Sequence, residues 1–336
     1  MAGHDIIVIG ASAGGVEALR ALMGALPPDL PAAVFVVIHI SPGVKSFLPT
    51  MLSNAGLLPA RHATDGEPIQ PGRIYVAPPD RHMVLRAGHV HLSAGPKENR
   101  TRPSVNPLFR SAAAAYGARV TGVVLSGALD DGTAGMLAVE RAGGVTLVQD
   151  PDEALFPSMP RSVIRYVDVD HVVSVNDMPE LLTRLASEPA AEAPAAPDPS
   201  PEGESRMETT GSGDSPGAPS GVTCPECRGV LWEERDGPLT EFRCRIGHRF
   251  SPESLMAEQD SESEVALAST LRSFEERASL AHTLADRARE RRMPRVEVER
   301  YSRQAREADE VAAQIRGMLH RGLTDEPNRA AQTGWT

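Results

Sequence analysis

The first half of the chain alternates short apolar runs with stretches in which apolar residues recur every three or four positions. The apolar runs predict strands over residues 5–10, 33–39, 73–77, 83–86, 89–93, 119–126 and 144–149. The periodic stretches predict helices near residues 14–26, 44–54, 104–116, 133–142 and 160–166. Strands separated by helices form βαβ units, so we expect an α/β domain over residues 1–186, built as a three-layer, doubly wound, mainly parallel sheet. A turn at Arg86-Ala87-Gly88-His89 predicts one antiparallel hairpin.

This periodicity stops after the first domain. Residues 187–220 are dominated by Pro, Ala, Glu, Ser and Gly, a composition that buries too little surface to fold, and we expect a flexible linker. A small cysteine-containing module is predicted over residues 221–252. Apolar residues then recur three and four apart on both sides of Pro294, which predicts an α-helical hairpin over residues 253–322. We expect residues 323–336 to be a disordered tail.

Composition and charge narrow the class of protein. Of the 336 residues 41% are hydrophobic but only 4% are aromatic, which is typical of an aliphatic α/β core. The net charge of −11 argues against a general nucleic-acid binder. No secretory signal is visible, and the longest apolar stretch, residues 32–40, is too short to span a bilayer. We therefore expect a cytoplasmic protein that is not embedded in a membrane.

A glycine-rich hexapeptide, Gly10-Ala11-Ser12-Ala13-Gly14-Gly15, joins the first predicted strand to the first predicted helix. Its serine would lie at the carboxyl end of a strand, where open α/β sheets bind ligands. The backbone amides of Ala13 and Gly14 are candidate donors to an oxyanion, should the Ser12 hydroxyl attack a carbonyl. The hexapeptide lacks the middle glycine of a dinucleotide fingerprint, and Val16 stands where a P-loop needs lysine. A plain glycine turn explains it equally well.

Polar residues follow three of the predicted strands. Ser12 follows the first, His39 ends the second, and Asp130-Asp131 follow a later one just before a helix. Parallel strands bring such ends to one edge of the sheet. A nucleophile, a base and an orienting carboxylate are what acyl transfer requires. Taken singly, His39 is better explained as an ordinary strand-end histidine, and the aspartate could be merely a helix N-cap.

The first domain resembles the catalytic domain of the chemotaxis protein-glutamate methylesterases, the CheB family. The similarity covers roughly residues 5–180 in family order. The matching segments are residues 7–15, the His39 segment with Pro42-Gly43, Asp65-Gly66-Glu67, and residues 74–83, 99–105 and 131–136. The resemblance implies a triad of Ser12, His39 and Asp131, with Asp131 chosen over Asp130 because the family acid directly precedes the glycine now at Gly132.

The resemblance also implies a reaction and a partner. The expected activity is that of a carboxylic ester hydrolase, a protein-glutamate methylesterase that converts glutamyl methyl esters of chemoreceptors to glutamate and methanol. Some family members also deamidate glutamine side chains. No cofactor is expected in catalysis. Arg100 and Arg102 are candidates for contacting an acidic receptor helix, although both are equally explained as surface or structural arginines.

The chain departs from the family pattern in three places. The family commonly has Gly-Met-Gly where this chain has Gly127-Ala128-Leu129, which bears on the fit of the substrate. Asp130 places a second carboxylate beside the acid, and two adjacent buried carboxylates should raise the apparent pKa of the pair. The family's best-known members carry a receiver domain before the esterase and this sequence shows none, so control by phosphorylation in cis is not expected.

All three cysteines of the chain fall within the predicted small module. Cys224 and Cys227 form a Cys-x-x-Cys pair, and Cys244 is followed four residues later by His248. A closed Cys3His set is typical of a structural zinc site, so we predict a zinc-ribbon-like fold. A redox or free-thiol role is the alternative. Clustered cysteines of odd number suit a reducing compartment better than disulfides.

Several interpretations of the function of the whole chain remain open. The zinc-ribbon-like module and the helical hairpin together predict docking to a protein partner or self-association. One rival function is a non-catalytic signalling scaffold that keeps the esterase fold. Another is a zinc-dependent DNA-binding regulator, which the acidic charge opposes. Four histidines show no ligand spacing and are predicted to be surface or hairpin residues: His62, His82, His89 and His91.

Overall fold

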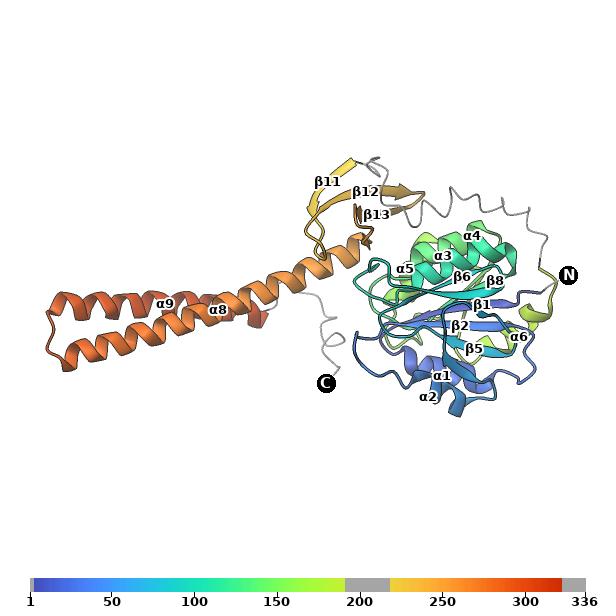
Figure 1. The fold of residues 1–336 in the computed structure, drawn as a ribbon, viewed down its shortest axis with the longest axis horizontal. Coiled ribbons are helices and arrows are strands. Elements are labelled where there is room, and N and C mark those ends of the chain that lie inside the picture. The colour runs from blue at the N-terminus through green and yellow to red at the C-terminus, as the bar shows by residue number, and fades with distance from the viewer. Residues whose placement is uncertain (1–2, 191–217, 322–336) are drawn as a thin grey trace. The chain divides into compact units, whose positions relative to one another are not determined.

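A computed structural model describes residues 3–190 and 218–321 of the chain. Its first part is a seven-stranded sheet in the order β10-β9-β8-β1-β2-β5-β3, and every neighbouring pair is parallel (Figure 1). The strands are β1 (Ile6–Ala11), β2 (Ala33–Ile38), β3 (Ala60–His62), β5 (Arg73–Val76), β8 (Val120–Val124), β9 (Val145–Gln149) and β10 (His171–Val173). The three central strands, β8, β1 and β2, are buried along their whole length. Continuous Val and Ile runs suit these positions because helices cover both faces of a parallel sheet.

Helices form the two outer layers. One face carries α1 (Gly15–Ala25), α2 (Leu48–Ala55) and α6 (Met178–Ser187), and the other carries α3 (Val105–Tyr116), α4 (Thr133–Arg141) and α5 (Ser158–Tyr166) (Figure 1). Each face of the sheet has its own apolar core, because successive strand residues point to opposite sides. The predicted three-layer, doubly wound α/β sandwich is thereby confirmed.

A second, three-stranded sheet packs against α3 in the order β4-β7-β6. It consists of β4 (Glu67–Pro68), β6 (His82–Arg86) and β7 (His89–Ser93), so the predicted hairpin is present. A short 3-10 helix, η1 (Gly117–Arg119), joins α3 to β8. Helix α2 begins at Leu48 and not at Val44, because Gly43 has a left-handed backbone (φ 82°) and Pro49 suits a first helical turn.

A small antiparallel sheet follows in the order β11-β12-β13-β14. Its strands are β11 (Ala218–Thr223), β12 (Val230–Asp236), β13 (Leu239–Cys244) and β14 (Arg249–Phe250). With the first residues of α8 they enclose a separate apolar core around Leu231, Phe250 and Leu255. We call residues 218–255 the Cys3His module. It belongs to the same compact unit as the α/β domain, Met1–Leu255.

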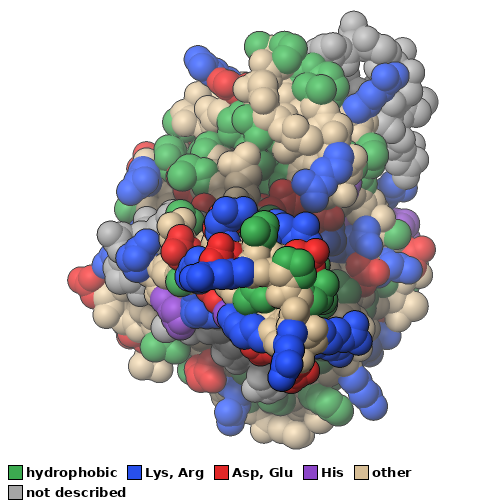
Figure 2. Space-filling model, turned by 90° about the vertical axis from the view of Figure 1, so that its left-hand side faces the viewer, with side chains coloured by type: hydrophobic (Ala, Val, Ile, Leu, Met, Phe, Trp, Pro, Cys, Tyr) green, Lys and Arg blue, Asp and Glu red, His purple; other side chains and the backbone are tan. Residues whose placement is uncertain are grey.

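The second compact unit, Met256–Thr336, is helical in its described part. It contains most of α8 (Pro252–Glu290) and all of α9 (Arg295–Arg321), which lie antiparallel (Figure 1). Alanines fill the contact between them, and His282 pairs with Asp309 at 2.8 Å. In the foreground of Figure 2, basic side chains are interspersed with acidic ones. The residues around the α8–α9 turn include such exposed arginines and glutamates. The helical hairpin predicted from the apolar stripes therefore forms.

Some predictions fall outside this description. Most of the predicted linker and the predicted disordered tail lie in residues 191–217 and 322–336, which are not among the described residues. No helix within residues 3–190 and 218–321 combines the length and apolar character that a membrane span requires.

Replacing Gly135 by alanine tests the close contact between α3 and α4. The added Cβ would lie 2.6 Å from the Phe109 Cβ, so the two helices would have to separate. Overpacking costs about 1–3 kcal/mol, more than the roughly 1 kcal/mol that alanine gains over glycine in helix propensity. Calorimetric unfolding of the full chain should show a lower midpoint for Gly135→Ala.

The matched control is Gly317→Ala in α9, where the nearest atom to an added Cβ is a nitrogen of the flexible Arg321 side chain at 3.5 Å. This substitution should leave the unfolding midpoint unchanged or raise it. A Gly135→Ala chain as stable as its parent would contradict the packing of the two helices.

Candidate active site

The candidate site lies beside β1, where the chain changes from adding strands on one side of the sheet to adding them on the other. From β1 the chain proceeds outward through β2 on one side, and later through β8, β9 and β10 on the other. Ligand sites of open α/β sheets form at such a switch point, outside the carboxyl ends of the strands. Ser12 follows β1 directly, and His39 follows β2 directly. Asp131 lies between β8 and α4.

Ser12 occupies a tight turn between β1 and α1. Gly14 has φ 70°, and a Cβ there would lie 2.8 Å from the Ser126 Oγ, so glycine is required for both reasons. The Ser12 amide donates to the Ser126 carbonyl oxygen at 3.0 Å, which ties this turn to the end of β8. The amides of Ala13 and Gly14, the candidate oxyanion donors, immediately precede the first residue of α1, Gly15.

The structure brings the three predicted triad residues together. The Ser12 Oγ lies 3.0 Å from the His39 Nδ1, and the His39 Nε2 lies 2.7 Å from the Asp131 Oδ2. An ionised carboxylate only accepts hydrogen bonds, so Nε2 carries the proton. In the neutral ring Nδ1 is then free to accept the Ser12 proton. The arrangement is that of a nucleophile, a base and an orienting acid.

Asp131 is almost completely buried, at 2% exposed. Its Oδ2 accepts from the Val105 amide at 2.7 Å, its Oδ1 accepts from the Gly132 amide at 3.0 Å, and the Ser104 Oγ lies 2.9 Å from both oxygens. Because Val105 opens α3, the carboxylate lies at the positive end of a helix. Burial alone would raise the pKa of Asp131, but the hydrogen bonds from His39, Val105 and Ser104 lower it to about 2. The group therefore stays ionised at neutral pH.

Two side chains beside Asp131 received no role from the sequence. Ser104 donates to the carboxylate, and the Asn99 Nδ2 donates to its Oδ1 at 3.2 Å. A serine just before a helical pattern is a recognisable signal for Ser104, but that signal predicts a cap and not a contact with an acid 27 residues away. Asn99 lies in one of the segments that match the family, but that segment does not indicate its partners, which come from distant parts of the chain.

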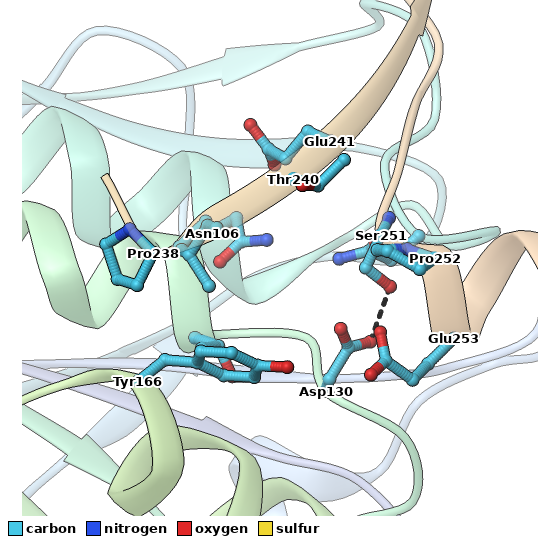
Figure 3. Close-up of a pocket in the computed structure, with 13 residues that line it drawn as sticks. Asn106, Asp130, Tyr166, Pro238, Thr240, Glu241, Ser251, Pro252 and Glu253 are labelled. Carbon is cyan, nitrogen blue, oxygen red and sulfur yellow. Dashed lines mark hydrogen bonds between the residues drawn. The ribbon is translucent and has the colours of Figure 1, made fainter. Parts of the chain in front are cut away.

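Asp130 has a different environment from its neighbour. Its side chain is 8% exposed and accepts a hydrogen bond from the Ser251 Oγ at 2.7 Å (Figure 3). Burial, together with the charges of Glu253 and Asp131, raises the pKa of Asp130 to about 7, although the Ser251 hydrogen bond acts in the opposite direction. The prediction of a raised pKa is thus confirmed for Asp130 and wrong for Asp131, because Asp131 accepts hydrogen bonds from the Val105 amide, Ser104 and His39.

The Gly127-Ala128-Leu129 departure has a conformational consequence. Leu129 has φ 61°, a left-handed backbone that costs a residue with a side chain about 1–2 kcal/mol. A Cβ on Gly127 would lie 2.0 Å from the Met159 Sδ and 3.0 Å from the Ser12 Cβ, so glycine is required there. The chain therefore keeps one essential glycine of this segment and accepts strain at the other position.

The two predicted substrate arginines differ in their surroundings. The Arg102 guanidinium donates to the Asp80 Oδ1 at 2.6 Å and to the carbonyl oxygens of Ala94 and Gly95 at 2.8 and 2.7 Å. These contacts hold the loop that Arg102 belongs to. Arg100 has a left-handed backbone, with φ 71°. Binding of substrate by either arginine stays a prediction.

One of the four histidines predicted to be surface or hairpin residues has a buried side chain. His82 lies in the β6–β7 hairpin but is buried, at 4% exposed. Its Nε2 lies 2.9 Å from the Pro96 carbonyl oxygen, and its Nδ1 accepts from the Ser104 amide at 3.3 Å. Burial lowers the pKa of His82, which favours the neutral ring that these two contacts require.

The Cys3His module gathers four potential metal ligands. One ligand atom from each of Cys224, Cys227, Cys244 and His248 lies within 4.8 Å of the others. The Cys227 and Cys244 sulfurs are 3.6 Å apart, and the His248 Nδ1 lies 3.7 Å from the Cys224 Sγ and 3.4 Å from the Cys244 Sγ. Two sulfurs bound tetrahedrally at about 2.3 Å from one ion would be roughly 3.8 Å apart. The cluster can therefore hold a tetrahedral metal ion.

The unusual pKa of Asp130 predicts how stability changes with pH. A carboxyl whose pKa is about 7 in the folded protein and 3.8 as its ordinary value stabilises the fold fully below pH 3.8, and this contribution is lost as the pH rises through 7. Asp130→Asn removes that loss. In urea unfolding, the free energy of unfolding of the variant relative to that of its parent should increase by up to about 4 kcal/mol between pH 4 and pH 8. A stability difference that does not change with pH would contradict the assignment.

Comparisons with known proteins identify a family for the first part of the chain. A family model described as CheB methylesterase matches residues 7–182. The protein-glutamate methylesterase/protein-glutamine glutaminase 2 of Anaeromyxobacter dehalogenans is 42% identical over 181 residues, which are 54% of this chain and 53% of that protein. A protein-glutamate methylesterase/protein-glutamine glutaminase of Yersinia pestis is 39% identical over 192 residues, which are 56% of this chain and 55% of that protein.

A solved structure is also similar. The Thermotoga maritima CheB methylesterase catalytic domain superimposes with a TM-score of 0.53 at 35% identity, over 55% of this chain and 100% of that one. The chain spans about half the length of the curated relatives that it matches. The family match covers just over half of the chain, and it includes all three residues at the switch point of the sheet. The chain belongs to the CheB methylesterase family.

Proposed function

We propose that this protein is a cytoplasmic protein-glutamate methylesterase that hydrolyses glutamyl methyl esters on chemoreceptor-type proteins, with deamidation of glutamine as a second activity. The observation that carries the proposal is the hydrogen-bonded series Ser12–His39–Asp131, with contacts of 3.0 and 2.7 Å. The names of the curated relatives support this substrate class.

The proposed reaction proceeds in two stages. The Ser12 Oγ attacks the ester carbonyl carbon while the His39 Nδ1 accepts the hydroxyl proton. The tetrahedral intermediate collapses, His39 returns the proton to the leaving oxygen, and methanol departs from an acyl-serine. Water, deprotonated by His39, then attacks the acyl group, and His39 returns the proton to the Ser12 Oγ as the bond to the acyl group breaks and the glutamate side chain is released. Asp131 stays ionised throughout and stabilises the imidazolium that forms at each stage.

Two further features of the site suit acyl transfer from a protein substrate. The amides of Ala13 and Gly14 lie at the start of α1, where the helix dipole favours the negative oxyanion. Exposed apolar side chains occur close to triad residues in the sequence or in space. Val44 and Phe47 follow His39 in sequence, and the Leu155 Cβ lies 2.9 Å from where a Cβ on Gly14 would be. Such a surface suits an apolar face of a protein helix better than a small soluble ester.

We also infer that the Cys3His module holds a structural zinc ion. Two of the thiols, Cys224 and Cys244, are buried, and the donor spacings suit tetrahedral coordination. Four protein ligands leave no open position for a substrate or water. When bound, zinc would cross-link β13 and the Cys224–Cys227 turn. Catalysis would remain with Ser12, His39 and Asp131.

Ser12→Ala tests the nucleophile. Methanol release from methylated chemoreceptor membranes should fall by at least about 10³-fold, because the remaining site retains only binding and oxyanion stabilisation. Ser187→Ala, which changes an exposed serine in α6, is the matched control and should keep the parent's rate. If Ser12→Ala still releases methanol at the parent's rate, the proposed mechanism is contradicted. A parent chain that releases none would favour the scaffold reading.

His248→Ala tests the metal site. The full chain, purified without added metal, should contain one zinc per chain by elemental mass spectrometry, and the variant should retain little. His89→Ala, at an exposed histidine of the β6–β7 hairpin, should keep the full zinc content. A parent chain that contains no zinc, or the same zinc content in His248→Ala, would contradict the assignment.

A further inference from the structure

A short loop of the α/β domain is held by the Cys3His module. We call residues 96–101 the Asn99 loop. The backbone N–H of Asn99 donates to the Arg249 carbonyl oxygen at 2.9 Å, and the backbone N–H of Arg249 donates to the Lys97 carbonyl oxygen at 3.4 Å. The Lys97 ammonium pairs with Glu226 at 2.8 Å. The loop is thereby fastened to two separate segments of the module: the Cys224–Cys227 turn, and the residue that directly follows His248.

The Asn99 side chain connects this loop to the catalytic acid. It is 8% exposed, and both ends of its amide have partners. The Nδ2 donates to the Asp131 Oδ1 at 3.2 Å, while the Oδ1 accepts from the Ser251 amide at 3.0 Å and from the Ser254 Oγ at 2.9 Å. Those two acceptor contacts determine which way the amide points. A reversed amide would place its oxygen against the carboxylate.

The backbone of the Asn99 loop does not favour this position by itself. Asn99 and Arg100 are consecutive residues with left-handed backbones, at φ 47° and 71°. Such conformations cost about 1–3 kcal/mol each and persist only where the surroundings impose them. The contacts to Arg249, Ser251 and Ser254 are those surroundings, and all three come from the Cys3His module.

The start of α8 lies close to both neighbouring carboxylates and contacts Asp130 directly. The Ser251 Oγ donates to Asp130 at 2.7 Å and accepts from the Ser254 amide at 3.0 Å, so it also caps the helix (Figure 3). The Ser254 side chain is fully buried against Asn99. One helix end therefore reaches Asp130 directly and Asp131 through a single intervening side chain.

We propose that the Cys3His module activates the esterase by positioning its catalytic acid: Ser251 and Ser254 orient Asn99, and Asn99 orients Asp131 against His39. The inference rests on the proposed function, since it assigns Asp131 the role of orienting acid. Asn99, Ser251 and Ser254 are positioning residues, because they act through Asp131. Their loss should slow the chemical step and leave substrate binding unchanged, because the exposed surface beside the triad is intact.

The test compares the full chain with Asn99→Ala, Ser254→Ala and the double variant. Ser254 is preferred to Ser251 because it provides no helix cap, and alanine is the better helix former. Ser269→Ala, an exposed serine in the same helix, is the matched control. Two rates are measured: methanol release, for kcat and KM, and covalent labelling of Ser12 by a fluorophosphonate, which needs the triad but no receptor.

The proposal predicts that Asn99→Ala lowers kcat and the labelling rate by about tenfold or more, and Ser254→Ala by about threefold or more, with KM within about twofold of the parent. The double variant should be no slower than Asn99→Ala, because both residues act through one contact. Ser269→Ala should match the parent. Additive losses in the double variant, or Ser254→Ala rates equal to those of Ser269→Ala, would overturn the proposal.

The two readouts separate failure of the inference from failure of the proposed function. If receptors yield no methanol but Ser12 is labelled, and labelling slows in the variants as described, the proposed substrate is wrong and the positioning role stands. If methanol release is normal and all variants match the parent, the positioning role is wrong and the proposed function stands. If Ser12 is not labelled in the parent, the triad assignment fails and the inference fails with it.

Discussion

The Asp131 carboxylate is the group on which the rest of the candidate site depends. It is buried, and burial opposes its negative charge. The opening amides of α3, the Ser104 hydroxyl and the His39 ring offset that cost and keep it ionised. An ionised Asp131 accepts the His39 Nε2 proton and so leaves Nδ1 facing Ser12 as a base. A neutral or misoriented acid would allow the other tautomer, which cannot accept the serine proton.

The sheet explains why these groups meet. Three neighbouring parallel strands, β8, β1 and β2, end at one edge, and the turns after them deliver Asp131, Ser12 and His39. Close packing beneath the site fixes the turns, since Gly14 and Gly127 lie where any side chain would collide with Ser126, Met159 or Ser12 itself. The same geometry separates two adjacent carboxylates. Asp131 faces the amides of α3 and is ionised, whereas burial and the nearby charge of Glu253 raise the pKa of Asp130.

The sequence was most informative about local structure and about the triad. Long apolar runs predicted each central strand to within two residues, because strands buried on both faces must be continuously apolar. The short strands β3, β4 and β10 and helix α6 were not predicted. Each of those strands has only two or three residues, too few to show a period.

The hydrogen bonds behind the triad could not be predicted from the sequence, for a different reason. They span 32 residues for Asn99 and Asp131, and 121 residues for Ser251 and Asp130. The sequence showed a separate cysteine-containing module and a family motif that includes Asn99. Nothing in either pattern indicated that the module holds that asparagine. Such contacts depend on how folded surfaces fit together, and periodicity does not encode that fit.

An ionised Asp131 should fix the tautomer of His39, and nitrogen NMR of the imidazole measures that tautomer. The chain would be labelled with ¹⁵N in its ten histidines, and the His39 signals identified by their loss in His39→Gln. At a pH where the ring is neutral, we expect a protonated Nε2 and an unprotonated Nδ1. A protonated Nδ1 beside Ser12 would contradict that expectation.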